Sequence, residues 1–249
     1  MSASTPLRQQ TKLQYSPVSL LDTDVARLYA HIHPITLLSI YFLSFKLIVA
    51  DPISALSSLL LPLATLQAAY VVVCFPPTGS HAVPGHKSGG PAKGGALKKG
   101  AKTKGEITLG MRVIPALISL LLSLSLGTPL FLFLTVLFGA PITTHIPHTV
   151  LLAAHLSLLT ALPIIYTRGI DRSTWRAVGA LLLPIDETFG AAVGACLGAW
   201  VGAVPIPLDW DRDWQRWPVT VLTGAYVGWA VGKTVGAFLF KGAIINLGP

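Results

Sequence analysis

Polar and apolar residues are grouped in long blocks along this chain, without the two-residue alternation of half-buried strands. Six apolar runs cover residues 34–50, 53–75, 111–140, 148–166, 177–204 and 219–240. Each run approaches or exceeds the roughly 20 residues that a membrane-spanning helix needs. The pattern predicts an all-α, polytopic membrane protein with about six transmembrane helices.

The third run is longer than the others and is interrupted at Gly127, Thr128 and Pro129. At about 1.5 Å per residue it exceeds the hydrocarbon thickness of a bilayer. Two arrangements remain open for residues 111–140. They form either one tilted, proline-kinked helix or two pieces that each cross half of the membrane.

Two polar segments differ sharply from the apolar runs. Residues 1–32 mix charges of both signs, and we expect a flexible cytoplasmic segment there, followed by a single transmembrane domain at 33–249. Residues 76–105 hold six lysines among Gly, Pro and Ser. Such a segment buries too little to offset its ordering entropy, so we expect a disordered, Lys/Gly-rich cytoplasmic loop.

Charged residues make up only 11% of the 249 residues, whereas soluble domains carry roughly 25%. This scarcity excludes an ordinary soluble enzyme. With six spans, 14 of the 18 Lys and Arg residues lie on the side of both termini, and two lie on the opposite side. The positive-inside rule then predicts cytoplasmic termini. The net charge of +8 requires no nucleic acid partner, because topology and attraction to anionic lipid explain it.

Glycine recurs at every fourth position in the last two runs. Residues four apart lie on one helix face, and ridges of small residues let helices approach closely in lipid. We expect the two ridges to pack against each other, and docking of a helix from another protein is the alternative. The ridges are Gly190, Gly194, Gly198 and Gly202 in the fifth run and Gly224, Gly228, Gly232 and Gly236 in the sixth.

Three charges fall within these two runs: Asp186, Glu187 and Lys233. An antiparallel register that pairs Gly190 with Gly228 brings Asp186 close to Lys233. Because a charge at mid-helix costs roughly 2.5–3.5 kcal/mol on insertion scales, a partner at matched depth is favourable. We therefore expect an intramembrane ion pair of Lys233 with Asp186 or Glu187. A proton or substrate relay through the carboxylates is the functional alternative.

The sequence lacks the common motifs of catalysis. It contains no His-Glu-x-x-His, no Gly-x-Ser-x-Gly and no Asp-rich pair of the kind that lipid phosphotransferases use. His145 and His148 have no acidic residue or cysteine nearby to complete a metal site. His155 lies inside a run, where a hydrogen bond to a neighbouring helix is the expected role. We expect no catalytic residue, no metal and no cofactor.

The last polar segment alternates acids with tryptophans between Asp209 and Trp214. Three carboxylates there could bind a divalent cation. Tryptophan, however, is typical of the membrane–water interface, where it anchors a segment at headgroup depth. Anchoring or partner docking is the favoured interpretation, and metal catalysis is the alternative.

A specific string surrounds this segment. Residues 202–218 read Gly-Ala-Val-Pro-Ile-Pro-Leu-Asp-Trp-Asp-Arg-Asp-Trp-Gln-Arg-Trp-Pro, and the glycine-spaced last run follows. This string closely resembles the PIG-F family. The likeness also includes His33, Pro34 and the fifth run, whereas the first 30 residues and the Lys/Gly-rich loop lie outside it.

The resemblance implies a role in assembly of the GPI anchor in the endoplasmic reticulum membrane. It implies a noncatalytic subunit that stabilises large ethanolamine phosphate transferases of the PIG-O and PIG-G kind, which add phosphoethanolamine to mannoses of the GPI precursor. A lipid or small-solute transporter using Asp186, Glu187 and Lys233 is the alternative. The residues expected to contact a partner or a lipid, including the GPI precursor, are Pro205, Pro207, Asp209, Trp210, Arg212, Trp214, Trp217 and Pro218.

Overall fold

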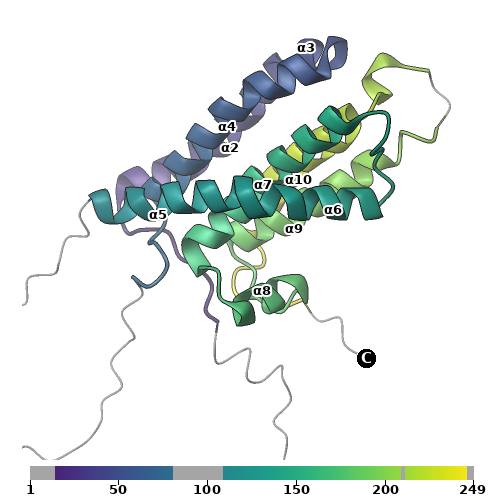
Figure 1. The fold of residues 1–249 in the computed structure, drawn as a ribbon. Helices are drawn as coiled ribbons and strands as arrows, with labels where there is room; N and C mark the ends of the chain where they lie inside the picture. The colour runs from purple at the N-terminus through teal and green to yellow at the C-terminus, as the bar shows by residue number, and fades with distance from the viewer. Residues whose placement is uncertain (1–14, 81–108, 209–210, 246–249) are drawn as a thin grey trace, which may run out of the picture.

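The computed structural model describes residues 15–80, 109–208 and 211–245 (Figure 1). Within these residues the secondary structure is helical, apart from one isolated bridge between Pro184 and Ile244. This confirms the predicted all-α class. The elements are α2 (Asp24–Leu43), α3 (Phe45–Ala50), α4 (Pro52–Cys74), α5 (Leu109–Leu122), η1 (Ser123–Gly127), α6 (Thr128–Leu137), α7 (Ile146–Arg168), α8 (Arg172–Gly179), α9 (Glu187–Ala203), η2 (Asp213–Gln215) and α10 (Val219–Phe238).

Three of the described helices are long and apolar enough to cross a membrane: Pro52–Cys74, Leu109–Leu137 and Ile146–Arg168. They correspond to the second, third and fourth predicted runs. The chain is therefore a polytopic, helical membrane protein. The larger number of about six spans stays a prediction.

The third run forms one continuous helix from Leu109 to Leu137. A π-helical turn, η1, joins α5 to α6 within it. The turn lies just before Pro129, which has no N–H to donate and whose ring crowds the preceding turn. A wider turn accommodates such a ring without ending the helix. Of the two arrangements that the sequence left open, the single helix is the one observed.

Helix α2 begins at Asp24, well before the apolar run that predicted it. Thr23 caps the helix, because its side-chain oxygen accepts a hydrogen bond from the Ala26 N–H at 3.2 Å. Residues 24–32, which we expected to be flexible, are thus helical. Residues 1–14 and residues 81–108 of the expected disordered loop lie outside the described residues.

The fifth run is divided between two helices. Helix α8 ends at Gly179, residues 180–186 are not helical, and α9 begins at Glu187. Pro184 cannot donate the N–H that a continuing helix requires. Asp186 then caps the new helix by accepting hydrogen bonds from the first turn of α9. The prediction of one helix over 177–204 is wrong for this reason.

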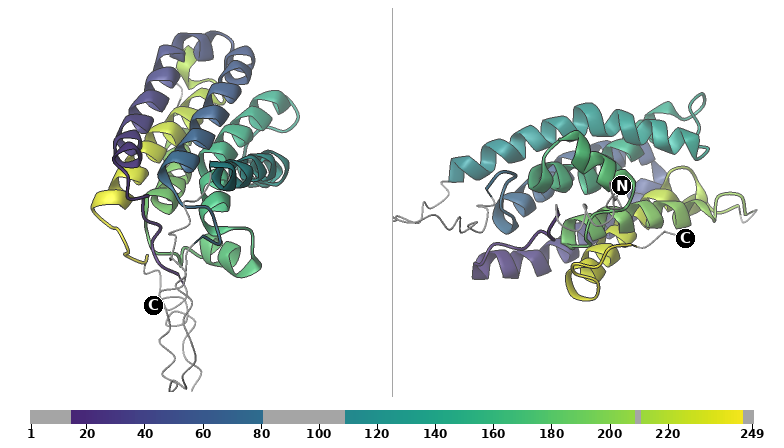
Figure 2. Two further views of the ribbon diagram at one scale, coloured as in Figure 1. Left: turned by 90° about the vertical axis from the view of Figure 1, so that its left-hand side faces the viewer. Right: turned by 90° about the horizontal axis from the view of Figure 1, so that it is seen from below.

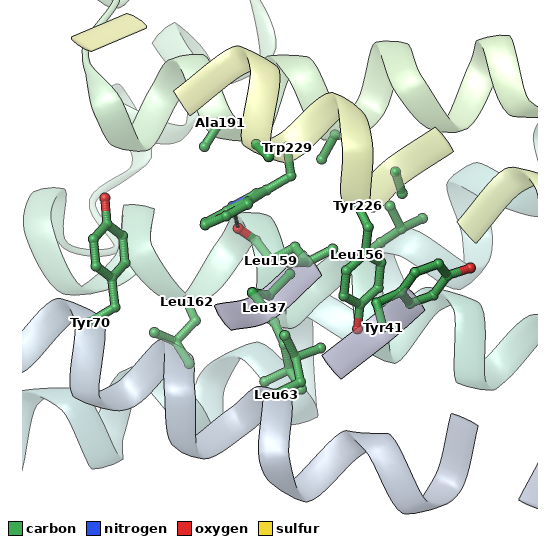
Figure 3. Packing of buried hydrophobic residues seen from close by; sticks show 14 of the residues in the cluster. Leu37, Tyr41, Leu63, Tyr70, Leu156, Leu159, Leu162, Ala191, Tyr226 and Trp229 are labelled. Carbon is green, nitrogen blue, oxygen red and sulfur yellow. Dashed lines mark hydrogen bonds between the residues drawn. The ribbon is translucent and has the colours of Figure 1, made fainter. Parts of the chain in front are cut away.

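Helix α7 forms the centre of the bundle. In its most apolar stretch of 18 residues, 89% of the residues are buried. Helices α4, α5, α6, α9 and α10 all pack against it (Figure 2). Buried side chains from several helices meet along it, and the indole N–H of Trp229 donates to the Leu159 carbonyl at 3.0 Å (Figure 3). This core holds α9 and α10 against the rest of the protein.

Candidate functional site

The glycine ridges of α9 and α10 are in direct backbone contact. A Cβ added to Gly194 would overlap the carbonyl oxygen of Gly228, and one added to Gly198 would overlap that of Gly224. Every other ridge glycine likewise faces backbone atoms of the opposite helix or of its cap. Only glycine permits this approach, because any side chain would separate the two backbones.

The register of the ridges differs from the prediction by one helical turn. Gly190 faces Gly232 rather than Gly228, and Gly194 faces Gly228. The predicted register is wrong because a four-residue repeat matches itself again after a shift of one turn. Glycine spacing alone therefore cannot choose between neighbouring registers.

Lys233 forms an ion pair with Glu187 on the inner side of the two helices. Its Nζ lies 3.0 Å from Glu187 Oε2, with only 6% and 13% of the two side chains exposed. The ammonium also donates to the Ala30 carbonyl at 2.7 Å and lies 5.2 Å from the centroid of the Tyr70 ring. The Tyr70 hydroxyl donates to Glu187 Oε2 at 3.0 Å. The pair thus connects α9 and α10 to α2 and α4 and gives both buried charges several partners.

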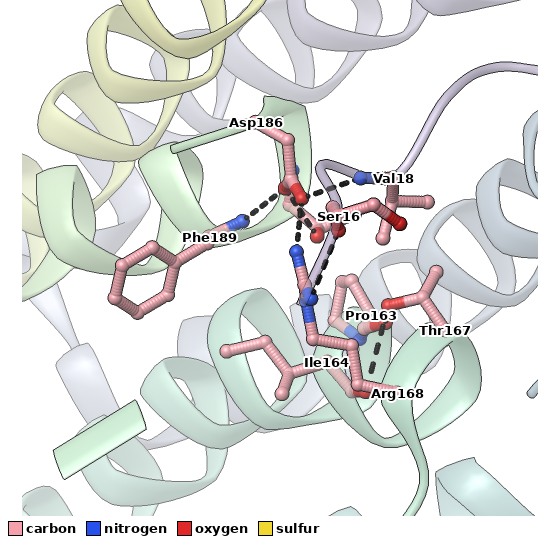
Figure 4. Close-up of polar contacts among 9 residues, drawn as sticks. Ser16, Val18, Pro163, Ile164, Thr167, Arg168, Asp186 and Phe189 are labelled. Atoms are coloured by element: carbon pink, nitrogen blue, oxygen red, sulfur yellow. Dashed lines mark hydrogen bonds and ion pairs between the residues drawn. The ribbon is translucent and has the colours of Figure 1, made fainter. Parts of the chain in front are cut away.

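Asp186 pairs with Arg168 rather than with Lys233 (Figure 4). Both side chains of this pair are almost fully buried. The Asp186 carboxylate also accepts the Val18 N–H at 2.9 Å. Asp186 is also the cap of α9. Its side chain meets Arg168 at the end of α7, and its own carbonyl oxygen lies against Gly236.

Arg168 and the segment before α2, residues 15–23, were not among the predicted site residues. The Arg168 guanidinium donates to the Ser16 carbonyl at 3.4 Å, so it joins this segment to α7 and α9. The capping role of Asp186 has a sequence signal, because a proline, an N-cap residue and Glu187 in the first turn mark a helix start. The contact with Arg168 has no such signal, since only the fold brings the two residues together.

Gln215 organises the connection between α9 and α10, residues 204–218. Its Oε1 accepts the Arg212 N–H at 3.0 Å. Its amide nitrogen donates to the carbonyl groups of Pro205 at 3.2 Å and Leu208 at 3.4 Å. One buried amide therefore ties together both halves of the connection. Sequence reasoning missed Gln215, because the carbonyl groups that it binds are neighbours only in the folded chain.

The predicted contact residues of this connection take different positions. The indole N–H of Trp217 donates to the Thr149 hydroxyl at 3.2 Å, which fastens the connection to α7. Pro218 is buried, Pro205 and Trp214 are half-buried, Pro207 and Arg212 are exposed, and Asp209 and Trp210 lie outside the described residues. Of the six predicted contact residues that the structure describes, only Pro207 and Arg212 are thus exposed.

Two buried histidines lie in the helical core. His155 contacts the Tyr226 hydroxyl through Nδ1 at 2.7 Å and the Leu56 carbonyl through Nε2 at 3.1 Å, which confirms the expected interhelical hydrogen bond. His33 stacks on Tyr70 with ring centroids 4.3 Å apart. Neither ring nitrogen of His33 makes a hydrogen bond of good geometry in the described part of the chain, although the Leu66 backbone lies close to the ring. Packing against aromatic rings therefore accounts for the position of His33.

One carboxyl group outside the apolar helices has a strongly shifted pKa. The pKa of Asp171 is lowered to about 2, because the hydroxyl groups of Ser173 and Thr174 and the Thr174 N–H donate to its carboxylate. Asp171 is the cap of α8, so this charge stabilises the start of that helix. Among the residues that the structure describes, no three His, Cys, Asp or Glu side chains are grouped as a metal site.

Comparison with known proteins adds the following similarities. Residues 32–237 match the model of the GPI biosynthesis protein family Pig-F. Glycosylphosphatidylinositol anchor biosynthesis protein 11 of Aspergillus fumigatus is 43% identical over 243 residues, covering 88% of this chain and 82% of that protein. The protein of the same name from Neurospora crassa is 45% identical over 226 residues (91% and 80%), and that from Pyricularia oryzae is 50% identical over 214 residues (84% and 75%). No solved structure gives a significant match.

Proposed function

Because the chain belongs to the GPI biosynthesis protein family Pig-F, we propose that it is a noncatalytic subunit of a GPI ethanolamine phosphate transferase. In this role it acts in the endoplasmic reticulum membrane and stabilises a large partner of the PIG-O or PIG-G kind. The partner transfers phosphoethanolamine to mannoses of the GPI anchor precursor. The names of the fungal relatives support a role in GPI anchor biosynthesis.

The observation that carries this proposal is the packing of the described residues of the connection between α9 and α10, 204–208 and 211–218. These residues belong to the string that resembles the family, and hydrogen bonds of Gln215 and Trp217 fasten them to one another and to α7. Pro207 and Arg212 are exposed on it. A prearranged, exposed segment suits docking of another protein, because little further ordering entropy is lost on binding.

The intramembrane charges support a structural role better than transport. Glu187 and Lys233 bind each other and are also bound by Tyr70 and the Ala30 carbonyl. The Asp186 carboxylate pairs with Arg168 and accepts hydrogen bonds from the first turn of α9. Each of these contacts stabilises the packing of the helices. We therefore do not favour the transporter among the functions that the sequence left open.

The experiment uses Gln215→Ala, which removes the amide that ties the connection together. In cells that lack the native chain, this variant should lose co-purification with the large transferase from detergent-solubilised membranes. Phosphoethanolamine on the GPI mannoses, measured by mass spectrometry, should fall in parallel. Arg172→Gln is the matched control, because it changes one exposed polar side chain on α8 and should alter neither measurement.

Two results would contradict the proposal. The first is full co-purification and normal phosphoethanolamine content with Gln215→Ala, provided that the variant chain is present at the native level. The second is phosphoethanolamine transfer by the purified chain without a partner. Solute or lipid flux by the purified chain would instead support the transporter.

A further inference from the structure

A proline lies inside each of two helices that contact α10. These are Pro34 in α2 and Pro163 in α7. Proline has no N–H, so the carbonyl group four residues earlier loses its helical donor. The two carbonyl groups belong to Ala30 and Leu159, which are 2% and 0% exposed. Because a buried carbonyl without a donor is costly, most of all in lipid, each of them requires a donor from another element.

Both donors come from one face of α10. The indole N–H of Trp229 donates to the Leu159 carbonyl at 3.0 Å (Figure 3). The Lys233 ammonium donates to the Ala30 carbonyl at 2.7 Å. Trp229 and Lys233 are four residues apart and therefore lie on the same side of the helix. Helix α10 is thus attached to α2 and α7 at the two carbonyl groups that proline leaves free.

The glycine ridges alone do not fix the position of α10 along α9. If α10 slides by four residues, about 6 Å, glycine again faces glycine. The ion pair of Lys233 does not decide the register either, because Asp186 precedes Glu187 and is the closer carboxylate in the neighbouring register. The same movement would carry Trp229 about 6 Å along α7, so its rigid indole would no longer reach the Leu159 carbonyl.

Helix α9 has its own fixed point on α7. Asp186, which caps α9, forms a buried ion pair with Arg168 at the end of α7. Trp229 attaches α10 to the same helix. Since α9 and α10 are both attached to α7, their positions relative to each other are determined. This information is absent from the glycine spacing.

We propose that Pro34 and Pro163 hold α10 in one of its glycine-matched registers. Each proline frees one buried carbonyl group, and Trp229 and Lys233 bind these two groups in the observed register. The prolines are positioning residues that act through the carbonyl groups four residues earlier. Without them, the ridges allow α10 to occupy the neighbouring register as well. The proposal does not depend on the subunit role proposed above.

The test measures the register by thiol crosslinking of the purified full chain in phosphatidylcholine vesicles. The facing glycines place Leu197 at the level of Val227, with Val193 one turn away. All three side chains lie on the outer side of the pair. A short bifunctional thiol reagent should link Leu197→Cys to Val227→Cys in the observed register and Val193→Cys to Val227→Cys in the neighbouring one. Cys196, which is exposed, is replaced by serine in every chain.

The decisive variant combines Pro34→Ala with Pro163→Ala. It restores two helical N–H groups that compete for the freed carbonyl groups, while the donors on α10 and the ion pair stay in place. If each interhelical hydrogen bond changes the equilibrium between registers about threefold, the preference for the Leu197–Val227 crosslink should fall by up to roughly tenfold. Alanine favours helix, so this variant should fold.

The matched control is Pro62→Ala in α4. It also restores a helical N–H, but the carbonyl group concerned belongs to Ser58, which is exposed. The crosslinking preference should not change in this variant.

A second variant removes the donors instead of the acceptors. It combines Trp229→Phe with Lys233→Met, and Glu187→Gln is added so that no buried charge is left unpaired. The preference for the observed register should fall at least as far as in the double proline variant, because both hydrogen bonds are then lost completely.

Three results would overturn the proposal. An unchanged preference in the double proline variant would mean that the freed carbonyl groups do not set the register. An equal fall in Pro62→Ala would show that loss of any helical proline has this effect. A full preference after removal of the donors would show that the ridges and the Asp186–Arg168 pair select the register without α2 and the middle of α7.

Discussion

The α9–α10 pair and the Leu109–Leu137 helix are built on opposite principles, although both are almost entirely apolar. The two paired helices meet backbone to backbone along their glycine ridges. The long helix is the most apolar of the three membrane-spanning candidates, yet only 17% of the residues in its most apolar stretch of 18 are buried. Of these three described helices, therefore, the most apolar one also faces outward most.

The difference follows from the solvent. In lipid, apolar side chains gain little by contacting each other instead of acyl chains, so close packing and polar contacts hold helices together. The pair uses glycine contacts and the Glu187–Lys233 ion pair. The long helix packs against α7 along α5, η1 and α6 with only one glycine, Gly127, placed tightly against it, and Ser157 donates a hydrogen bond to the Ser123 carbonyl at 2.6 Å. Substitutions should therefore affect the two regions very differently.

The largest effect is expected from breaking the buried ion pair. Lys233→Ala leaves the Glu187 carboxylate buried without its cation, and loss of one partner of such a pair costs about 3–5 kcal/mol. Unfolding of the purified protein by added SDS, followed by circular dichroism, measures this loss.

The matched variant for that measurement is the double replacement Glu187→Gln with Lys233→Met, which removes both charges and keeps similar volumes. It should recover most of the stability, because no uncompensated charge remains. If the double variant is as unstable as Lys233→Ala alone, the charges do not compensate each other.

A smaller but clear effect is expected at the glycine ridges. The Cβ of Gly194→Ala would meet backbone atoms of Gly228 and Gly232, which cannot move without separating the helices. Overpacking of this kind costs about 1–3 kcal/mol. Gly110→Ala on α5 is the control, since no described atom outside its own stretch of helix lies within 4 Å of the added Cβ, and higher helix propensity should stabilise it by up to about 1 kcal/mol. Equal stability of both variants in the SDS titration would mean that the backbones are not in contact.

The smallest effect is expected at Gly127 on the long helix. There the added Cβ would meet the Ser157 hydroxyl, a side chain that can rotate away from its hydrogen bond to the Ser123 carbonyl. The loss should be about 1 kcal/mol, the usual contribution of one hydrogen bond. Once Ser157→Ala has removed that hydroxyl, Gly127→Ala should cost less, as a double-mutant cycle can measure. A loss as large as that of Gly194→Ala would remove the difference between the two regions.

Several features of the fold and the site could be predicted from the sequence. The long apolar runs predicted the all-α membrane class, and the family match confirms the resemblance drawn from residues 202–218. The ridges were predicted to pack together, and an acidic partner was expected for Lys233. These predictions depend on the repeat of apolar residues or glycines along the chain and on the free-energy cost of a charge in lipid. Both can be judged from a short stretch of sequence.

Other features could not be predicted, because they depend on contacts between distant residues. The register of the ridges is one, since a glycine repeat is compatible with shifts of one turn. The partner of Asp186 is another, since Arg168 and Val18 come from separate elements. Gln215 was missed for the same reason. The break before α9 was predictable in principle from Pro184 and Asp186, but the apolar composition of the run concealed it.

The sequence by itself determined the class of the protein, the approximate limits of most helices and the family, because hydropathy, glycine spacing and a rare string can be read one segment at a time. The tertiary structure decided which carboxylate meets which cation and how the ridges align. Those outcomes depend on the relative positions of whole helices. In lipid, few apolar contacts are specific enough to fix such positions, so backbone contacts and a few buried polar pairs must do so.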